Sequence, residues 1–229
     1  MRALVIRFAD VEGPGILADL LRENGYSLSY HDAYKNIDLL PNAHLQYSLF
    51  LFMGGPQSVH DPELFKFFNP YRNLIQNAFS IGKKIIGICL GAQLIADSLG
   101  SKVKKGEKGQ ELGWGKVELL GNHPFFEGLD SRDITVFHFH GDTFDLPEGS
   151  DHLAQSDLYP SQMFAIDGRA IGIQFHIEIT EMILKNWKSR FPELGPVLSE
   201  SKSEELKEMQ KFGYKILNNI IQYQNNANK

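Results

Sequence analysis

The chain has 229 residues, a length that corresponds to one large domain or two small ones. Hydrophobic residues make up 42% and charged residues 22% of the sequence, which is ordinary globular usage and excludes disorder as the default state. The formal net charge of −5 argues against a protein whose main task is to bind nucleic acid.

The first half of the chain alternates short apolar runs with segments of helical period. The apolar runs predict buried strands at Ala3–Ile6, Ser48–Met53 and Lys84–Ile88. Helical spacing follows them at Ile16–Leu21, Leu74–Phe79 and Gly91–Leu99. Strands without polar alternation, separated by helices, indicate a mainly parallel sheet covered on both faces, that is, a three-layer α/β/α fold.

The second half has shorter and more turn-rich segments. We expect strands at Gly115–Leu119, Ile134–His138, His152–Gln155, Met163–Ile166 and Ala170–Phe175, the last two joined as a hairpin through Asp167-Gly168. Helices are expected at Thr180–Arg190 and from about Ser201 to Gln224. The last helix has one apolar stripe, made of Leu206, Met209, Phe212, Ile216, Leu217 and Ile220. We therefore expect one α/β domain over residues 1–195 and a helical extension over residues 196–229 that packs on it.

The cysteine content and the apolar runs indicate a compartment. Cys89 is the only cysteine, so no intramolecular disulfide is available and a reducing environment is expected. Met1–Phe8 has no cleavage site of the signal-peptide type, and Leu49–Met53 is too short to span a bilayer. We expect a cytoplasmic protein that binds neither membrane nor nucleic acid.

The sequence Gly87-Ile88-Cys89-Leu90-Gly91 lies between a predicted strand and a predicted helix. This is the G-x-nucleophile-x-G pattern of a nucleophile elbow, with cysteine as the nucleophile. A sharp reversal strains the backbone of the nucleophile, and glycines two residues away remove side chains that would collide. The helix N-terminus favours a thiolate at Cys89. A buried inert cysteine is the alternative interpretation.

A thiol nucleophile needs a base, and the base needs an acceptor that orients it. His176 follows the apolar run Ala170–Gln174, at the carboxyl edge of the sheet where ligands bind in open α/β folds. Glu178, two residues further on, could hold its imidazole. Alone, His176 could be a core histidine and Glu178 a helix N-terminal carboxylate.

These motifs together resemble the class I glutamine amidotransferases, in particular the branch similar to GMP synthase. The resemblance rests on Gly87–Gln93, on Gln174–Glu178, on the turn Gly54-Gly55-Pro56, and on Glu111–Trp114 and His140–Phe144. It spans about residues 1–190. In that family proline often stands between the histidine and the glutamate, where this chain has Ile177.

The resemblance implies a Cys89–His176–Glu178 triad that acts on glutamine or a γ-glutamyl compound through a thioester. It further implies an oxyanion hole formed by the N–H groups of Gly55 and Leu90, and no cofactor. By the same similarity Gln93, Gly141 and Asp142 bind the glutamyl end of the substrate. Gln93 could instead be a polar residue on the first helical turn, and Gly141 a turn glycine.

His138-Phe139-His140-Gly141-Asp142 has a rival interpretation, because H-x-H-x-D resembles half of a metallohydrolase site. No second histidine follows the aspartate directly, and no other histidine or cysteine cluster completes the set. We therefore expect no metal. The charges of Lys102, Lys104 and Lys105 are expected on a solvated strand face.

No phosphate loop and no dinucleotide-binding glycine motif is present, so we expect a glutaminase-type domain without an ATP-dependent synthase half. Three functions remain open. The chain could be an amidotransferase subunit that hands ammonia to a synthase or acceptor subunit, an autonomous γ-glutamyl hydrolase, or a catalytically idle regulatory module of the same fold.

Overall fold

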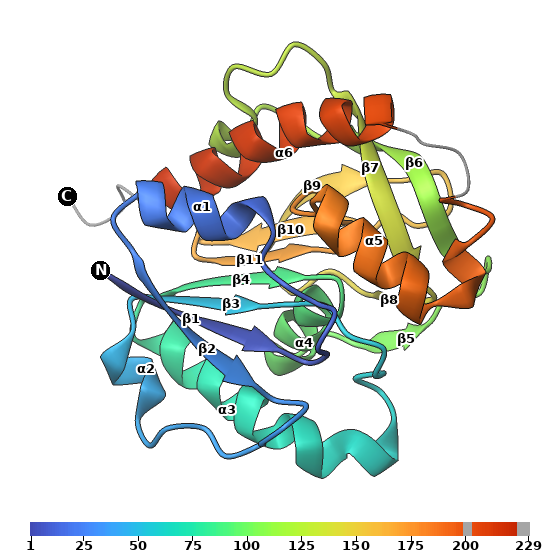
Figure 1. Cartoon of the computed structure of the whole chain (residues 1–229). Helices are drawn as coiled ribbons and strands as arrows, with labels where there is room; N and C mark the ends of the chain where they lie inside the picture. The colour runs from blue at the N-terminus through green and yellow to red at the C-terminus, as the bar shows by residue number, and fades with distance from the viewer. Residues whose placement is uncertain (199–202, 224–229) are drawn as a thin grey trace.

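A nine-stranded sheet forms the centre of the molecule in the computed structural model, which describes residues 1–198 and 203–223 (Figure 1). The strand order is β2-β1-β3-β4-β11-β10-β9-β6-β7. Five neighbouring strands of this sheet run parallel to one another. They are β1 (Arg2–Arg7), β2 (Ser27–Asp32), β3 (Leu49–Phe52), β4 (Lys84–Ile88) and β11 (Ala170–Ile173).

Antiparallel strands extend the sheet beyond β11. They are β10 (Met163–Ile166), β9 (Asp151–Gln155), β6 (Glu111–Leu119) and β7 (Asp133–His140). The predicted hairpin at Asp167-Gly168 joins β10 to β11, with Asp167 in a left-handed conformation at φ 52°. Two short strands, β5 (Val103–Lys105) and β8 (Asp142–Phe144), form a separate antiparallel pair.

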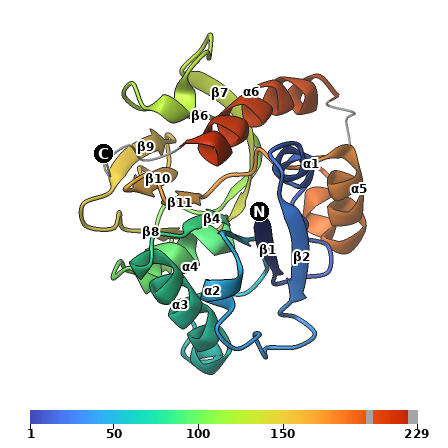
Figure 2. The same ribbon diagram turned by 90° about the vertical axis from the view of Figure 1, so that its left-hand side faces the viewer.

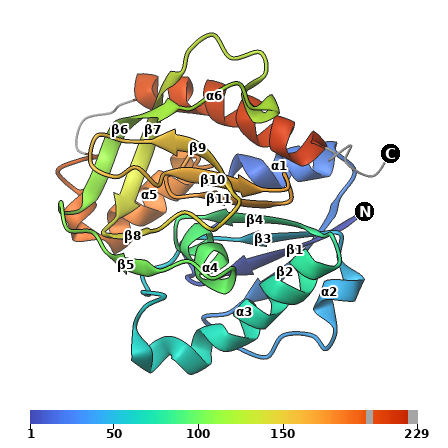
Figure 3. The same ribbon diagram turned by 180° about the vertical axis from the view of Figure 1, so that it is seen from behind.

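Helices cover both faces of the sheet, as Figures 1, 2 and 3 show from three sides. On one face lie α1 (Ile16–Glu23), α5 (Glu181–Arg190) and α6 (Ser203–Gln222); on the other lie α2 (Ala43–Gln46), α3 (Phe65–Ser80) and α4 (Leu90–Ser98). Short 3₁₀ turns occur at Pro62–Leu64, Pro124–Phe126 and Pro192–Leu194. Alternate residues of β1 enter opposite cores, Ala3 and Val5 on the α1 side and Leu4 and Ile6 on the α3 side.

Helix α6 is fastened to the sheet at its C-terminal end by a half-buried lysine. The Nζ of Lys84, at the start of β4, donates to the carbonyl oxygens of Ile220, Ile221 and Tyr223 at 2.7–3.0 Å. These are carbonyl groups that the helix itself leaves unpaired. Burial lowers the pKa of Lys84 to about 8. Among the described residues, no helix is long and apolar enough to cross a membrane.

The structure differs from the sequence expectations in places where the chain is polar. Strand β2, with the sequence SLSYHD, is half-buried at the edge of the sheet. It was not predicted, because it contains no apolar run. Strand β6 begins at Glu111 rather than at Gly115, and β11 ends at Ile173 rather than at Phe175. Residues 201, 202 and 224 of the predicted last helix lie outside the described residues.

Candidate active site

Cys89 is the turning point between β4 and α4. Its backbone has φ 53° and ψ −109°, a conformation that residues other than glycine rarely adopt. A Cβ atom on Gly91 would lie 2.1 Å from the carbonyl oxygen of Phe52, and one on Gly87 would lie 2.4 Å from the backbone of Gly91. Both glycines are therefore sterically required, as the elbow pattern predicts.

His176 is fixed by backbone and side-chain contacts. Its N–H and C=O exchange hydrogen bonds with Phe137 of β7 at 2.8 and 3.1 Å. Its Nδ1 lies 2.7 Å from Oε1 of Glu178, and both side chains are almost fully buried. The other carboxylate oxygen, Oε2, accepts a hydrogen bond from the N–H of Ile177 at 3.0 Å. The ring of Trp187 packs edge-on against the imidazole, with centroids 4.9 Å apart.

Electrostatics make His176 a strong base. Burial alone would lower the pKa of this imidazole, but the negative charge of Glu178, the neighbouring thiol of Cys89 and the hydrogen bond to Glu178 raise it well above its usual value. Because Nδ1 is bonded to Glu178, the nitrogen left for the thiol of Cys89 is Nε2. The thiol itself donates to the carbonyl oxygen of Phe139 at 3.7 Å, and a strong base in the same cavity is the arrangement that nucleophilic cysteines require.

The thiol and the imidazole open into a cavity of about 340 Å³. Seven of the eight residues predicted for the site line it, namely Gly55, Cys89, Leu90, Gln93, Gly141, Asp142 and His176. Glu178 does not line the cavity and lies behind the imidazole of His176. The sequence therefore predicted a set of residues that the fold brings to one place.

The turn after β3 lies against the start of α4. A Cβ on Gly55 would be 2.8 Å from Cβ of Phe8 and 2.9 Å from Cδ2 of Leu90, so this position accepts no side chain without rearrangement. Gly55 and Leu90 are thus neighbours on the wall of the cavity that also holds Cys89.

The predicted substrate-binding residues form a connected group. The Nε2 of Gln93 donates to Oε1 of Gln174 at 3.1 Å and to the carbonyl oxygen of Asp142 at 3.4 Å. The carboxylate of Asp142 accepts a hydrogen bond from the hydroxyl of Ser58 at 2.5 Å. These contacts hold the turn at Gly141 over the cavity.

Glu12 lines the same cavity and was missed by the sequence analysis. Its side chain is buried, and in the part of the chain that the structure describes its Oε2 has no hydrogen-bond partner. That atom lies 2.8 Å from where a Cβ of Gly54 would be. Burial raises the pKa of Glu12 to about 7, with a smaller lowering by His176 and a smaller raising by Glu178. Its position just beyond the carboxyl end of β1 is the signal that could have revealed it.

The loop that carries Glu12 also touches the back of the histidine–glutamate pair. The N–H of Ile16 donates to the carbonyl oxygen of Glu178 at 2.9 Å, and the indole N–H of Trp187 donates to the carbonyl oxygen of Val11 at 3.2 Å. Gly15 allows this approach, because a Cβ there would lie 1.8 Å from the same Glu178 oxygen.

Comparison with known sequences gives consistent matches. The sequence model described as glutamine amidotransferase class-I matches residues 15–186. The glutamine amidotransferase-like protein YfeJ of Salmonella typhimurium is 30% identical over 189 residues, which cover 79% of this chain and 77% of that protein. A glutamine-hydrolyzing GMP synthase of Thermomicrobium roseum is 35% identical over 150 residues, 63% of this chain and 27% of the synthase.

Solved structures agree with the sequence matches. A glutamine amidotransferase of Thermotoga maritima superposes with a TM-score of 0.84 at 31% identity, over 96% of both chains. A glutamine amidotransferase of Methylobacillus flagellatus superposes with a TM-score of 0.82 at 25% identity, over 96% of this chain and 94% of that one. The α/β fold class predicted from the sequence is confirmed.

Proposed function

Because the chain belongs to the class I glutamine amidotransferase family, we propose that it cleaves the γ-amide of glutamine or of a γ-glutamyl compound by covalent catalysis at Cys89. Membership of the family confirms the resemblance inferred from the sequence motifs. One observation carries the proposed mechanism. His176 is held by Glu178 through a 2.7 Å contact on one ring nitrogen, which leaves the other nitrogen for the thiol of Cys89 in the same cavity.

In the first step Sγ of Cys89 attacks the γ-carbonyl carbon, and His176 accepts the thiol proton. The C–N bond then breaks, the protonated Nε2 of His176 delivers that proton to the leaving ammonia or amine, and a γ-glutamyl thioester remains on Cys89. The raised pKa of His176 suits proton acceptance, and Glu178 stabilises the imidazolium that forms.

The thioester is resolved by water. His176, now neutral, takes a proton from the attacking water, and the thiolate of Cys89 leaves with release of glutamate. The negative oxygen of both tetrahedral intermediates is assigned to the N–H groups of Gly55 and Leu90, which flank Cys89 on the cavity wall. A single donor of this kind typically contributes about 2.7–4 kcal/mol to the transition state.

The charge of the cavity supports recognition of the glutamyl end. Glu12, Asp142 and Glu193 line it, and within the described residues no lysine or arginine does. An acidic wall suits the α-ammonium group of a γ-glutamyl substrate. We assign that contact to Asp142, with Gln93 and Gly141 shaping the same wall.

Transfer of ammonia to a synthase domain or subunit is the second candidate. The GMP synthases that the chain matches are longer, and the chain spans 27% and 33% of two of them. In this case the activity depends on a partner, whereas an autonomous γ-glutamyl hydrolase would act alone. The compact C-terminal packing of α6 on α1 and β7 favours the autonomous enzyme, because it covers that apolar face within the chain.

A substrate panel on the purified protein tests the proposal. Ammonia or amine release is measured from glutamine, γ-glutamyl peptides and γ-glutamyl amides, with and without a synthase. Turnover of a γ-glutamyl peptide by the protein alone supports the hydrolase, and turnover that requires the synthase supports ammonia transfer. A protein that turns over no member in either condition, while intact and folded, contradicts the catalytic proposal.

Covalent labelling gives an independent test, because Cys89 is the only cysteine. A glutamine-like electrophile should add one adduct, seen in the intact mass and mapped to the Cys89 peptide. His176→Ala and Cys89→Ala should each remove nearly all turnover, and the double variant should be little worse, since the two side chains act as a unit. Near-normal turnover in His176→Ala would refute the assigned base.

A further inference from the structure

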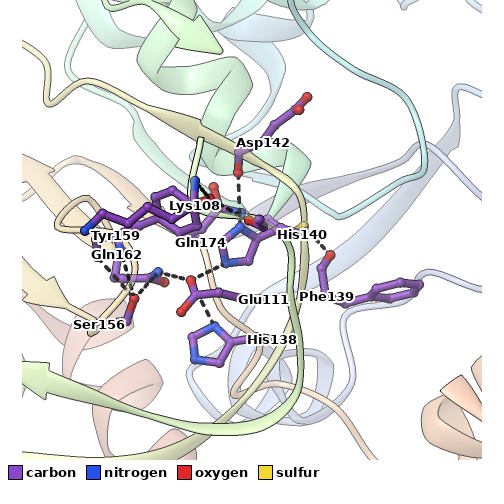
Figure 4. Close-up of polar contacts among 12 residues, drawn as sticks. Lys108, Glu111, His138, Phe139, His140, Asp142, Ser156, Tyr159, Gln162 and Gln174 are labelled. Atoms are coloured by element: carbon purple, nitrogen blue, oxygen red, sulfur yellow. Dashed lines mark hydrogen bonds and ion pairs between the residues drawn. The ribbon is translucent and has the colours of Figure 1, made fainter. Parts of the chain in front are cut away.

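Three metal-binding side chains meet on one face of the β6–β7 pair, beside the candidate active site (Figure 4). Glu111 lies opposite His140 in the register of the two strands, and His138 is two residues before His140 on the same face of β7. All three side chains are buried. The glycine at position 115 makes room for the ring of His138, whose Cδ2 lies 2.7 Å from where a Cβ would be.

One ring nitrogen of each histidine faces the same carboxylate oxygen of Glu111. Nδ1 of His140 lies 3.1 Å from the carbonyl oxygen of Asp142, which can only accept, so Nδ1 carries the proton. Its Nε2 then presents a lone pair 3.0 Å from Oε2 of Glu111. Nδ1 of His138 lies 3.8 Å from that oxygen and has no hydrogen-bond partner among the described residues.

Two buried acceptors, Nε2 of His140 and Oε2 of Glu111, face each other at 3.0 Å and repel unless a cation lies between them. A shared proton is one such cation, and a metal ion is the other.

The distances and the surrounding contacts suit a metal ion. Zinc bonds of about 2.1 Å in a tetrahedron separate two ligand atoms by about 3.4 Å, and the two measured separations of 3.0 and 3.8 Å bracket that value. Outer contacts fix the ligands as metal sites require: Gln162 donates to Oε2 of Glu111 at 2.6 Å, and His140 is held by Asp142. An adjacent cavity of about 570 Å³, lined by Glu111 and His138, leaves room for a further ligand.

We propose that Glu111, His138 and His140 bind one divalent transition-metal ion, Zn²⁺ in the first instance. The ion joins β6 to β7 and, through His140 and the carbonyl of Asp142, holds the turn that lines the candidate substrate cavity. This inference does not depend on the proposed amidotransferase chemistry. It departs from the expectation of no metal, which rests on the lack of a completing histidine or cysteine cluster in the sequence.

Calorimetry with Zn²⁺ on chelator-treated protein tests the proposal. One ion per chain should bind, and the thermal midpoint should rise with the metal. His138→Gln and Glu111→Gln should each weaken the binding by more than a hundredfold, and Gln162→Leu, which keeps all three ligands but removes the donor to Glu111 and Ser156, by about 10–100-fold. His44→Gln, on helix α2, is the matched histidine control and should bind Zn²⁺ as the unaltered chain does.

Cys89 and His176 are a second pair that could take Zn²⁺, so every titration is repeated in Cys89→Ala. Unchanged binding in that variant supports the Glu111 site. Binding that is lost in Cys89→Ala and kept in His138→Gln overturns the proposal. So does the absence of binding in the folded unaltered chain, which would leave a proton as the cation between these groups. Metal content and calorimetry report on all variants whether or not they retain turnover.

Discussion

Replacing Glu12 by glutamine should make the protein more stable at high pH and leave it little changed at low pH. Burial raises the pKa of this carboxyl from 4.5 to about 7 in the native state. At about 1.4 kcal/mol per pKa unit, this difference corresponds to about 3 kcal/mol. Since the side chain is buried, solvent screening does not reduce this value appreciably.

The direction in which stability changes with pH follows from proton linkage. The native pKa lies above the unfolded value, so the protonated carboxyl contributes its full stability below about pH 4.5 and loses it as the pH rises through about 7. Glutamine keeps the shape and carries no charge. The stability of Glu12→Gln relative to the unaltered chain should therefore increase by about 3 kcal/mol between pH 4.5 and pH 9.

Urea unfolding at these two pH values measures the effect. Asp10→Asn is the matched control, because Asp10 is exposed in the same loop, and it should show no such pH-dependent gain. If the free energies of unfolding of Glu12→Gln and of the unaltered chain differ by the same amount at both pH values, burial does not raise the pKa of Glu12, and the argument is refuted.

Three further substitutions test the scaffold of the site. Gly91→Ala should lower the free energy of unfolding by about 3 kcal/mol or more, or prevent folding, because its Cβ meets the carbonyl of Phe52. An unchanged urea midpoint would contradict the elbow geometry. Lys84→Met should lose about 1–3 kcal/mol in urea unfolding by uncapping α6, and no loss would show that water replaces the lysine. Trp187→Phe should lower the free energy of unfolding by about 1 kcal/mol, because the hydrogen bond from the indole N–H to the carbonyl of Val11 is lost. A larger decrease would mean that the packing of the indole contributes more than this hydrogen bond.

The elbow and the parallel strands could be predicted because their signals are local. Continuous apolar runs mark strands buried on both faces, and two glycines around Cys89 mark a turn that a Cβ would block. Strand β2 could not be predicted in this way. Its polar sequence pairs only with β1 at the sheet edge, and that pairing comes from the tertiary fold.

The residues missed at the site depend on contacts between distant segments. Glu111 meets His140 only because β6 and β7 pair in one register, and nothing in the local sequence sets that register. Glu12 reaches the cavity because its loop packs against Glu178 and Trp187, far along the chain. The spacing of His138 and His140 predicted that they share one face of a strand. Glu111 joins them only when the sheet has formed.

Ile177 stands where proteins of this family often have proline, and this difference adds a hydrogen-bond donor to the site. Proline often stands between the histidine and the glutamate in related proteins and would stiffen the turn, but it has no N–H. Here the N–H of Ile177 donates to Oε2 of Glu178 at 3.0 Å, so each carboxylate oxygen has its own donor. Ile177→Pro removes one donor to a buried charge, a loss of about 1–2 kcal/mol, or about 5–30-fold in kcat at little-changed KM.

Ile177→Val is the matched control for this substitution, because it keeps the N–H and most of the buried side chain. It should retain nearly all of the turnover. The carbonyl of Ile177 also packs against Gly213 of α6, where a Cβ would lie 2.2 Å away, so a urea midpoint is measured for both variants to separate misfolding from misorientation. Equal kcat in folded Ile177→Pro and Ile177→Val would show that the bond between Glu178 and His176 alone orients the imidazole, and that the second donor is dispensable.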